Sequence, residues 1–519
     1  MSDGVLVDAR RYNVVGDGVT DNHGHLQNFV QALASAGPGA TGVLPPGTIL
    51  TSGPLAYGAH SGIHIVGNGR GATILTKTGN FDLVQMNGSG TGQPNHCSRC
   101  SLSNLGLSGT PPGGSTYTGR LIDCAYADNL IVQAVDLLSN NDVGIDMVET
   151  WDSHFDDIVC DAVSSGTAPS IWIRSSRAAS GFGQSSDSTN VIRLTNIRCE
   201  SWKHGAIRIE QGTGGTQLPN QIWLSKVKCE SYLLRAPAIS IPYPGASVVH
   251  MKDLYIFMGG FDSGFSTAQP AIDFRSLALA GSLRDCHIGN ASAATVLEGV
   301  YALVGAPLVI DNVDGSYGAA PTSGYHVNLA GGGPYHIGAC PVNGNNATPV
   351  HFAAGVGSLT WPYVNSTIAS SKVTGGSGET LIDNLKIPAD TLMVGSHVRV
   401  RGRGQVSATS STTLNGRIRV GEGGSTGDAQ ACVSGAVRTT SAAVGFEFDG
   451  DLTVQSAGSR GKAIANCKMT VGGRVLLSAQ TAPVTIDTTV DEFVDLTLQA
   501  GNPSARVTVT NAVIEIVRL

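Results

Sequence analysis

VDARRYNVVGDGVTDN, residues 7–22, places Asp17 between two glycines, Gly16 and Gly18, close to the start of the chain. A Gly-Asp-Gly run is typical of a tight turn, because glycine adopts positive φ at little steric cost. This turn leads directly into a segment with helical periodicity.

Residues 20–36 predict one amphipathic helix. Its apolar residues recur with the spacing of a single helix face, and they are Leu26, Phe29, Val30 and Leu33. We expect Thr20 or Asp21 to be the N-cap and SAGPG (35–39) to end the helix.

The pattern then changes to short β-rich runs, GVLPPGTILTSGPL (42–55) and GIHIVGNGRGATIL (62–75), interrupted by glycine and proline. One short helix followed by an all-β chain is the arrangement expected when a helix covers the open end of a β-solenoid.

The same stretches resemble the N-terminal signature of the pectate-lyase-like superfamily, whose members are right-handed parallel β-helix proteins and include many phage tailspikes. DARRYNVVGDGVTDN (8–22), LPPGTIL (44–50) and IVGNGRGATIL (65–75) carry the resemblance, which covers residues 7–80 and departs from the family at NHGH (22–25). It implies a fold and leaves the reaction open.

Composition excludes several classes of protein. The 519 residues include 68 glycines and only 14% charged residues, which favours a turn-rich β protein over a coiled coil or charged disorder. A net charge of −7 without a basic block argues against nucleic acid and membrane surfaces as partners. We expect no transmembrane helix and no signal peptide.

A coil-length repeat supports the solenoid. Six segments of the form apolar–outward–apolar align with one another, as period-2 strands require. They are LIDCAY (121–126), GIDMVE (144–149), SIWIRS (170–175), AIRIEQ (206–211), AISIPY (238–243) and AIDFRS (271–276).

A second strand repeats in step with the first, most clearly in NIRCESW (196–202) and KVKCESY (226–232). The alternation predicts that Cys160, Cys199 and Cys229 stack inside the solenoid as buried, unreactive thiols. The repeat interval grows where loops are inserted between the two strands, and such loops commonly build a binding face.

The chain is expected to be all-β: a right-handed parallel β-helix with a short N-terminal capping helix, then a C-terminal β-sandwich. We expect the cap and first coils at 1–78, the central β-helix at 79–365, a linker at 366–379, and a carbohydrate-binding or trimerisation sandwich at 380–519. VRVRGRGQV (398–406) and VTVTNAVIEIVRL (507–519) also resemble C-terminal domains of phage tail fibres.

Outward residues of stacked coils should form ladders, since adjacent strands lie about 4.8 Å apart. One predicted ladder is Asp161, Glu200 and Glu230, and another joins Trp172 and Arg208, with Arg174 and Glu210 beside them. Carboxylates about 5–9 Å apart are the acid and the base or nucleophile of glycoside hydrolysis. The alternative for each carboxylate is a solvated salt-bridge ladder.

ETWDSHFDD (149–157) adds further carboxylates around Trp151, and exposed aromatic rings offer flat faces to sugars. The predicted catalytic residues are Glu149, Asp152, Asp161, Glu200, Glu210 and Glu230. The predicted substrate-binding residues are Trp151, Trp172, Arg174, Trp202, Arg208, Tyr232 and Tyr243.

We expect no cofactor and no bound metal. HCSRC (96–100) contains a Cys-x-x-Cys, but without a matching second pair it indicates ordinary β-region cysteines rather than zinc. A lyase with Ca²⁺ on the Asp161 ladder and Arg198 or Lys228 as base is the rival to hydrolysis within the fold.

By resemblance, the chain is expected to be a phage tailspike that binds and depolymerises bacterial capsule or O-antigen. The resemblance implies a homotrimer on the virion tail, outside the host after lysis, attached through an adaptor or baseplate protein. The alternatives are a lyase of the same fold, a non-catalytic receptor-binding adhesin and a free bacterial enzyme.

Overall fold

The computed structural model describes residues 5–519 except 91–94, 164–166, 178–187, 292–294, 332, 339, 345–347, 353–357, 361–370, 375–377, 388–391, 393, 409–410, 440–442, 478–482, 503 and 519. The chain forms two compact units. One contains residues 1–331 and 340–350, and the other contains residues 332–339 and 351–519.

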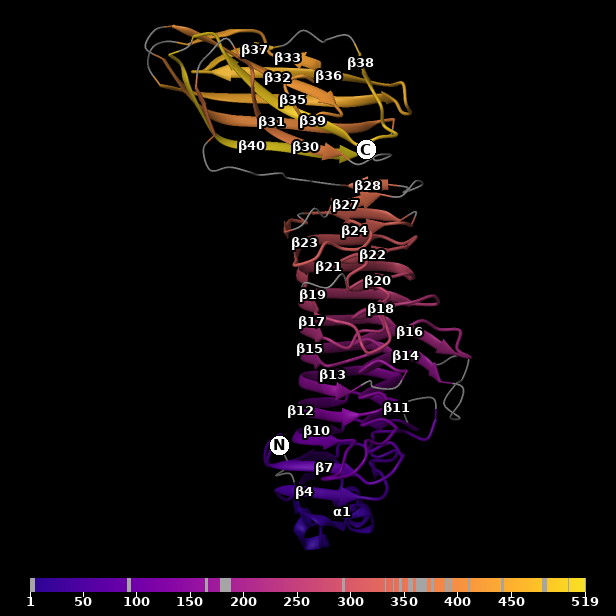
Figure 1. The fold of residues 1–519 in the computed structure, drawn as a ribbon. Coiled ribbons are helices and arrows are strands. Elements are labelled where there is room, and N and C mark those ends of the chain that lie inside the picture. The colour runs from indigo at the N-terminus through magenta and orange to yellow at the C-terminus, as the bar shows by residue number, and fades with distance from the viewer. Residues whose placement is uncertain are drawn as a thin grey trace. The chain divides into compact units, whose positions relative to one another are not determined.

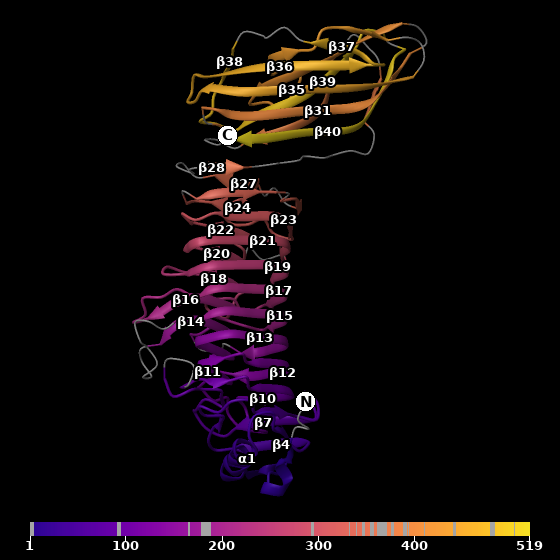
Figure 2. The same ribbon diagram turned by 180° about the vertical axis from the view of Figure 1, so that it is seen from behind.

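Strands β1–β28 form one parallel sheet of 28 strands, wound as a right-handed β-helix. The strands are β1 (Leu6–Asp8), β2 (Asp17–Asp21), β3 (Thr41–Val43), β4 (Gly47–Thr51), β5 (Leu55–Ala56), β6 (His64–Val66), β7 (Thr73–Lys77), β8 (Val84–Gln85), β9 (Cys97–Ser98), β10 (Ser101–Ser108), β11 (Ile122–Asp128), β12 (Ile131–Asn140), β13 (Ile145–Val163), β14 (Ile171–Arg177), β15 (Asn190–Glu200), β16 (Ile207–Thr213), β17 (Asn220–Ser231), β18 (Ile239–Ile241), β19 (Ala246–Met258), β20 (Ile272–Phe274), β21 (Leu277–Asn290), β22 (Val300–Ala302), β23 (Leu308–Tyr317), β24 (Tyr325–Leu329), β25 (Pro334–Ile337), β26 (Val342–Gly344), β27 (Thr348–Phe352) and β28 (Ser358–Thr360). Figures 1 and 2 show them stacked in successive coils.

The interior of the β-helix is the predicted one. The inward residues of the six aligned segments are fully buried: Ile122, Cys124, Ile145, Met147, Ile171, Ile173, Ile207, Ile209, Ile239, Ile241, Ile272 and Phe274. Cys160 pairs in register with Cys199, and Cys199 with Cys229, all of them buried. The predicted cysteine ladder is therefore confirmed.

The N-terminal cap consists of a short 3-10 helix, η1 (Ala9–Tyr12), and α1 (His23–Ala36). The predicted apolar face of α1 is confirmed, because Leu26, Phe29, Val30 and Leu33 are all buried. The predicted start of the helix is wrong. Residues 17–21 form β2 and pair with β4, so α1 begins three residues later than expected.

Of the two predicted N-caps, Asp21 accepts a hydrogen bond from the backbone N–H of His23, the first residue of α1, at 3.1 Å, whereas Thr20 has another partner. Asn22 occupies the N-cap position, and its side chain bonds to backbone groups of Val15 and Leu50 instead of capping α1. Thr20 donates its hydroxyl to Asp17 at 2.7 Å. This hydrogen bond, together with backbone donors, lowers the pKa of Asp17 to about 2. The predicted Gly-Asp-Gly turn is wrong, because Asp17 and Gly18 belong to β2; the pairing of β2 with β4 is irregular between Asp17 and Asp21, where Gly18 has a φ of +71°.

Gly16 allows a close backbone approach. A Cβ added at Gly16 would lie 2.1 Å from the carbonyl oxygen of Pro46, and one added at Gly47 would lie 2.0 Å from the carbonyl oxygen of Gly16. The chain entering the cap and the chain entering β4 therefore touch backbone to backbone at these two glycines.

The second unit contains a β-sandwich of two antiparallel sheets, as predicted for the C-terminal part. The seven-stranded sheet consists of β29 (Ser371–Thr374), β31 (Ser396–Ser407), β35 (Val444–Ser456), β36 (Gly461–Val471), β37 (Arg474–Leu477), β38 (Val484–Ile486) and β40 (Arg506–Arg518). The five-stranded sheet consists of β30 (Thr380–Ile387), β32 (Thr412–Gly421), β33 (Ala429–Val433), β34 (Val437–Thr439) and β39 (Glu492–Ala500).

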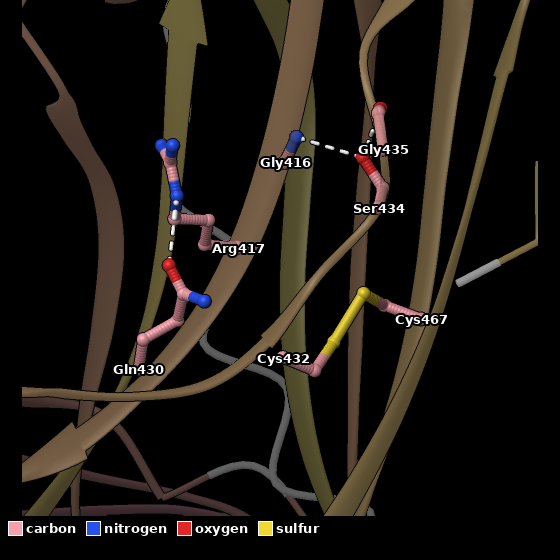
Figure 3. The surroundings of a disulfide bond; sticks show 7 residues. All are labelled: Gly416, Arg417, Gln430, Cys432, Ser434, Gly435 and Cys467. Carbon is pink, nitrogen blue, oxygen red and sulfur yellow. Dashed lines mark hydrogen bonds between the residues drawn. A yellow bond between two sulfur atoms is a disulfide. The ribbon is translucent and has the colours of Figure 1, made fainter. Parts of the chain in front are cut away.

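A disulfide between Cys432 of β33 and Cys467 of β36 joins the two sheets (Figure 3). Alternation in SHVRVRGRGQV gives the reason for the sandwich: Val398, Val400 and Val406 are buried between the sheets, while Arg401 and the other arginines face outward. The disulfide itself was not predicted from the sequence.

We expect Gly16→Ala to lower the free energy of unfolding by about 1–3 kcal/mol, because the added methyl group meets backbone atoms that have no rotamer to move to. The matched control is Gly24→Ala in α1, where an added Cβ meets nothing within 4 Å. Helix propensity predicts that this control is neutral or stabilising by up to about 1 kcal/mol. Urea unfolding of both variants tests the prediction, and equal midpoints would contradict it.

Candidate functional site

Most of the predicted ladder residues lie on two separate outward faces of the β-helix. We call the outward side of β15 and β17 the Glu200 face, and the outward side of β14, β16 and β20 the Trp172 face. Figure 1 shows β14 and β16 reaching further to the side than β18 and β20.

The Glu200 face carries the first predicted ladder. Asp161 is in register with Glu200, and Glu200 with Glu230. Lys228 lies 2.8 Å from a carboxylate oxygen of Glu230 and 3.5 Å from one of Glu200, and Arg198 lies 3.3 Å from Glu200. Glu200 and Glu230 are therefore paired with cations at the surface, the arrangement of a salt-bridge ladder.

The Trp172 face brings four predicted residues into direct contact. Trp172 donates its indole N–H to Glu210 Oε1 at 2.8 Å, and Arg208 donates to Glu210 Oε2 at 2.7 Å. The Arg174 guanidinium lies 3.8 Å from the centre of the Trp172 ring, a cation–π contact. Glu210 is thus held as a carboxylate with both oxygens hydrogen-bonded, beside a half-buried indole.

A buried ion network fixes this arrangement from one side. Asp146 is fully buried and accepts hydrogen bonds from Arg174, Arg177 and Arg120 at 2.6–2.9 Å. Burial raises the pKa of Asp146, but the charge and hydrogen bonds of Arg174, with Arg177 and Arg120, outweigh it and lower the pKa to about 2. Asp146 therefore stays ionised and holds Arg174 beneath Trp172.

Further residues on the Trp172 face were missed in the sequence. Asp273 follows Arg208 and Ser240 in register, and Tyr301 follows Asp273. Arg275 donates to both oxygens of Asp273 at 2.9–3.0 Å. The signal was present, because the outward positions of AIDFRS align with those of SIWIRS and AIRIEQ.

Burial raises the pKa of two carboxyl groups at this end of the face. Burial raises the pKa of Asp273, which Arg275 opposes, and burial also raises the pKa of Glu298. Glu298 accepts a hydrogen bond from Asn328 at 3.1 Å. A carboxyl group with a raised pKa is the usual form of a general acid in glycoside hydrolysis.

The predicted cluster in ETWDSHFDD is dispersed. Glu149 is buried and faces the buried ring of His96, 3.6 Å away, whereas Asp152 is exposed. Both residues have positive φ, which breaks the alternation expected along a strand. Trp151 packs on His96, with ring centres 4.4 Å apart, and donates its N–H to the Ser188 carbonyl.

The remaining aromatic predictions separate clearly by burial. Trp202 is fully buried, so the expectation that its ring is exposed to a sugar is wrong. Its place in the repeat turns inward because the chain leaves β15 at Ser201, which has a positive φ. Tyr232 and Tyr243 are exposed, at 54% and 81%, and stay predictions as binding residues.

Cys97 and Cys100 of HCSRC are both buried thiols. Across the described ranges of the chain, no group of three or more His, Cys, Asp or Glu residues is arranged to hold a metal ion. Within the same ranges, no helix is both long and apolar enough to span a membrane.

Comparison with known proteins supports the N-terminal resemblance. Residues 6–223 match the sequence model of a family described as rhamnogalacturonase A/epimerase, pectate lyase-like. The predicted resemblance to pectate-lyase-like proteins is thereby confirmed for this part of the chain. No curated protein matches the chain.

Three solved structures match the chain at low sequence identity. ORF18 of Geobacillus virus E2 is 12% identical with a TM-score of 0.50, over 93% of this chain and 76% of that one. The A-module of the mannuronan C-5 epimerase AlgE4 from Azotobacter vinelandii is 14% identical (TM-score 0.44; 68% and 99%). Tailspike protein 4 of bacteriophage CBA120 is 8% identical (TM-score 0.41; 100% and 69%). The likeness to the viral ORF18 shows a common fold.

The buried network around Asp146 makes a stability prediction. Asp146→Asn should cost about 3–5 kcal/mol, because it leaves buried guanidinium groups without their shared carboxylate. The exposed Asp161→Asn is the control and should change stability by less than about 0.5 kcal/mol. Denaturant unfolding at neutral pH measures both, and similar values would count against a buried, coupled network.

The same pair predicts a difference in acid. The folded pKa of Asp146, about 2, lies below its ordinary value of 3.8. Its contribution to stability is therefore complete above pH 3.8 and is lost as the pH falls through about 2. Asp146→Asn should lack this part of the acid dependence, while Asp161→Asn should retain it. Unfolding midpoints measured from neutral pH to pH 2 test this.

Proposed function

We propose that the chain is a tailspike-type depolymerase that binds bacterial surface polysaccharide, capsule or O-antigen, and hydrolyses its glycosidic bonds on the Trp172 face. The observation that carries the proposal is the fixed carboxylate of Glu210, bonded to the indole of Trp172 and to Arg208. A carboxylate beside a half-buried aromatic ring combines a reacting group with a surface on which a sugar ring stacks.

Two carboxyl groups with different environments support hydrolysis. Glu210 accepts hydrogen bonds from Trp172 and Arg208, whereas burial raises the pKa of Asp273. Arg208, beside Glu210, and Asp273 are two strands apart in register, which corresponds to about 9–10 Å between backbones. Glu210 and Asp273 therefore lie on β16 and β20 of the same face, with β18 between these two strands.

In the proposed reaction, Glu210 removes a proton from a water molecule while the oxygen of that water forms a bond to the anomeric carbon. Asp273 gives its proton to the glycosidic oxygen as the bond from that oxygen to the anomeric carbon breaks. Arg208 orients the chain of sugars, with Trp172 as the stacking surface and Arg174 supporting the Trp172 ring from beneath.

The lyase alternative has weaker support on the Glu200 face. The hydrogen bond from Lys228 to Glu230 raises the pKa of Lys228, so the ammonium group keeps its proton. Lys228 is therefore poorly suited to act as the base of a lyase, which must be deprotonated. The adhesin alternative uses the same aromatic and charged residues without the proton transfers.

The assembly belongs to the same proposal. We infer a homotrimer carried on the virion tail through a separate adaptor or baseplate protein, with polysaccharide as the external partner. The likeness in fold to a viral protein is consistent with this context. Sedimentation of the purified chain tests the trimer.

Glu210→Gln and Asp273→Asn should each lower the cleavage rate by about 10²–10⁴-fold while binding is retained, because each removes one proton transfer. Purified capsules and O-antigens are incubated with each variant, and new reducing ends and the absorbance of an unsaturated product are followed. The control, Asp285→Asn, changes an exposed carboxylate on β21.

Each readout separates the alternatives. Reducing ends without absorbance support hydrolysis, and absorbance supports a lyase. Binding without either product supports the adhesin. Loss of cleavage in Glu230→Gln but not in Glu210→Gln would transfer the reaction to the Glu200 face.

Arg275→Gln should shift the basic limb of the pH–rate profile to higher pH. Arg275 lowers the pKa of Asp273, so its loss lets the acid keep its proton to a higher pH. The acidic limb should stay in place. Arg284→Gln, an exposed change on β21, is the control, and equal profiles for both variants would remove Asp273 from the role of acid.

A further inference from the structure

The outer face of the seven-stranded sheet carries a regular charge pattern that the proposed reaction does not use. Three arginines alternate along β31, and each lies in register with an acid of β35. The pairs are Arg399–Asp451 at 3.5 Å, Arg401–Asp449 at 3.5 Å and Arg403–Glu447 at 2.6 Å. Guanidinium donors and carboxylate acceptors thus repeat together along two adjacent strands.

A hollow of about 470 Å³ lies over part of this pattern. It is lined by Arg399, Arg401, Asp449, Gly450, Asp451, Asn466, Cys467 and Lys468. A second hollow of about 580 Å³ lies over Arg403 and Glu447 on the same two strands. Both volumes fall within the range of about 300–1,000 Å³ that is usual for small-ligand sites.

The first hollow contains unused positive charge. Lys468 follows Asp449 in register on β36, yet within the described part of the chain it forms no ion pair. Arg401 meets Asp449 through Nε at 3.5 Å, and its side chain is 47% exposed, so its terminal nitrogens face the hollow or solvent. An ammonium and a guanidinium directed to one hollow favour a carboxylate there, although the whole chain carries a net charge of −7.

The other lining groups match hydroxyl groups. Asp449 and Asp451 accept hydrogen bonds, and the Asn466 amide both donates and accepts. A ligand that offers one carboxylate and several hydroxyls satisfies both sets, and a uronic acid is such a ligand. Because a second hollow follows along the same strands, a chain of sugars fits the pattern better than a single one.

We propose that this face of the sandwich is a second saccharide-binding site, selective for polysaccharide that carries uronic-acid carboxylates, with Arg401 and Lys468 binding the carboxylate. The inference takes its ligand class from the proposed function and so rests on it. It places substrate capture and cleavage on different units of the chain.

The test measures binding of the full chain to oligogalacturonate by calorimetry, with maltohexaose as the neutral probe and polyglutamate as a polyanion without sugar rings. Oligogalacturonate is expected to bind more tightly than either. The double variant Arg401→Gln/Lys468→Gln should weaken its binding by about 10- to 100-fold. Lys462→Gln, on β36 outside the hollow, is the matched control and should bind as the unchanged protein does.

Three results would overturn the proposal: no measurable binding of oligogalacturonate, equal binding of maltohexaose or polyglutamate, or equal binding by the double variant with its fold confirmed by thermal unfolding. A change in sedimentation of the double variant, with saccharide binding unchanged, would instead make this face a contact between copies. Weaker oligogalacturonate binding by the double variant separates this site from the proposed reaction, because Arg401 and Lys468 line the hollow of the sandwich and the result does not require any polysaccharide to be cleaved.

Discussion

The parallel hydrogen bonding between successive coils is the constraint on which the β-helix depends. Strand pairing at about 4.8 Å fixes which residues lie above one another, so residues some thirty positions apart become neighbours. Inside, this register aligns Cys160, Cys199 and Cys229. Outside, it places Arg208 two strands from Asp273 and next to Trp172. The same strand register therefore determines both the packing of the interior and the positions of the candidate functional residues outside.

The register explains why much of the architecture could be predicted from sequence. Alternation within AIRIEQ and its relatives specifies which side chains are inward, and repetition specifies their partners. The contacts between Trp172, Arg174, Arg208 and Glu210 follow from the same rows. Asp273 and Arg275 occupy the equivalent outward positions of a later coil, and they could have been predicted by extending the same alignment to that coil.

The features that could not be predicted from the sequence depend on changes of chain direction between strands and on the contacts of long side chains. Positive φ at Glu149 and Ser201 changes the direction of the next side chains, and a period-2 pattern contains no sign of it, so Glu149 and Trp202 are buried. Arg120 and Arg177 reach Asp146 from the coils on either side of it, and residue spacing does not predict where such long side chains end. The pairing of Cys432 with Cys467 likewise requires the two sheets to be placed face to face.

The helix α1 has a role beyond burial of its own apolar face. A stack of parallel strands ends in unpaired N–H and C=O groups, which accept further strands as readily as the coils accept one another. Covered by α1 and η1, the first coil is closed to such addition (Figure 1). The cap therefore prevents molecules from adding end to end. A molecule without the cap would expose unpaired strand edges of the kind that stack in a cross-β fibril, and such molecules would assemble into filaments.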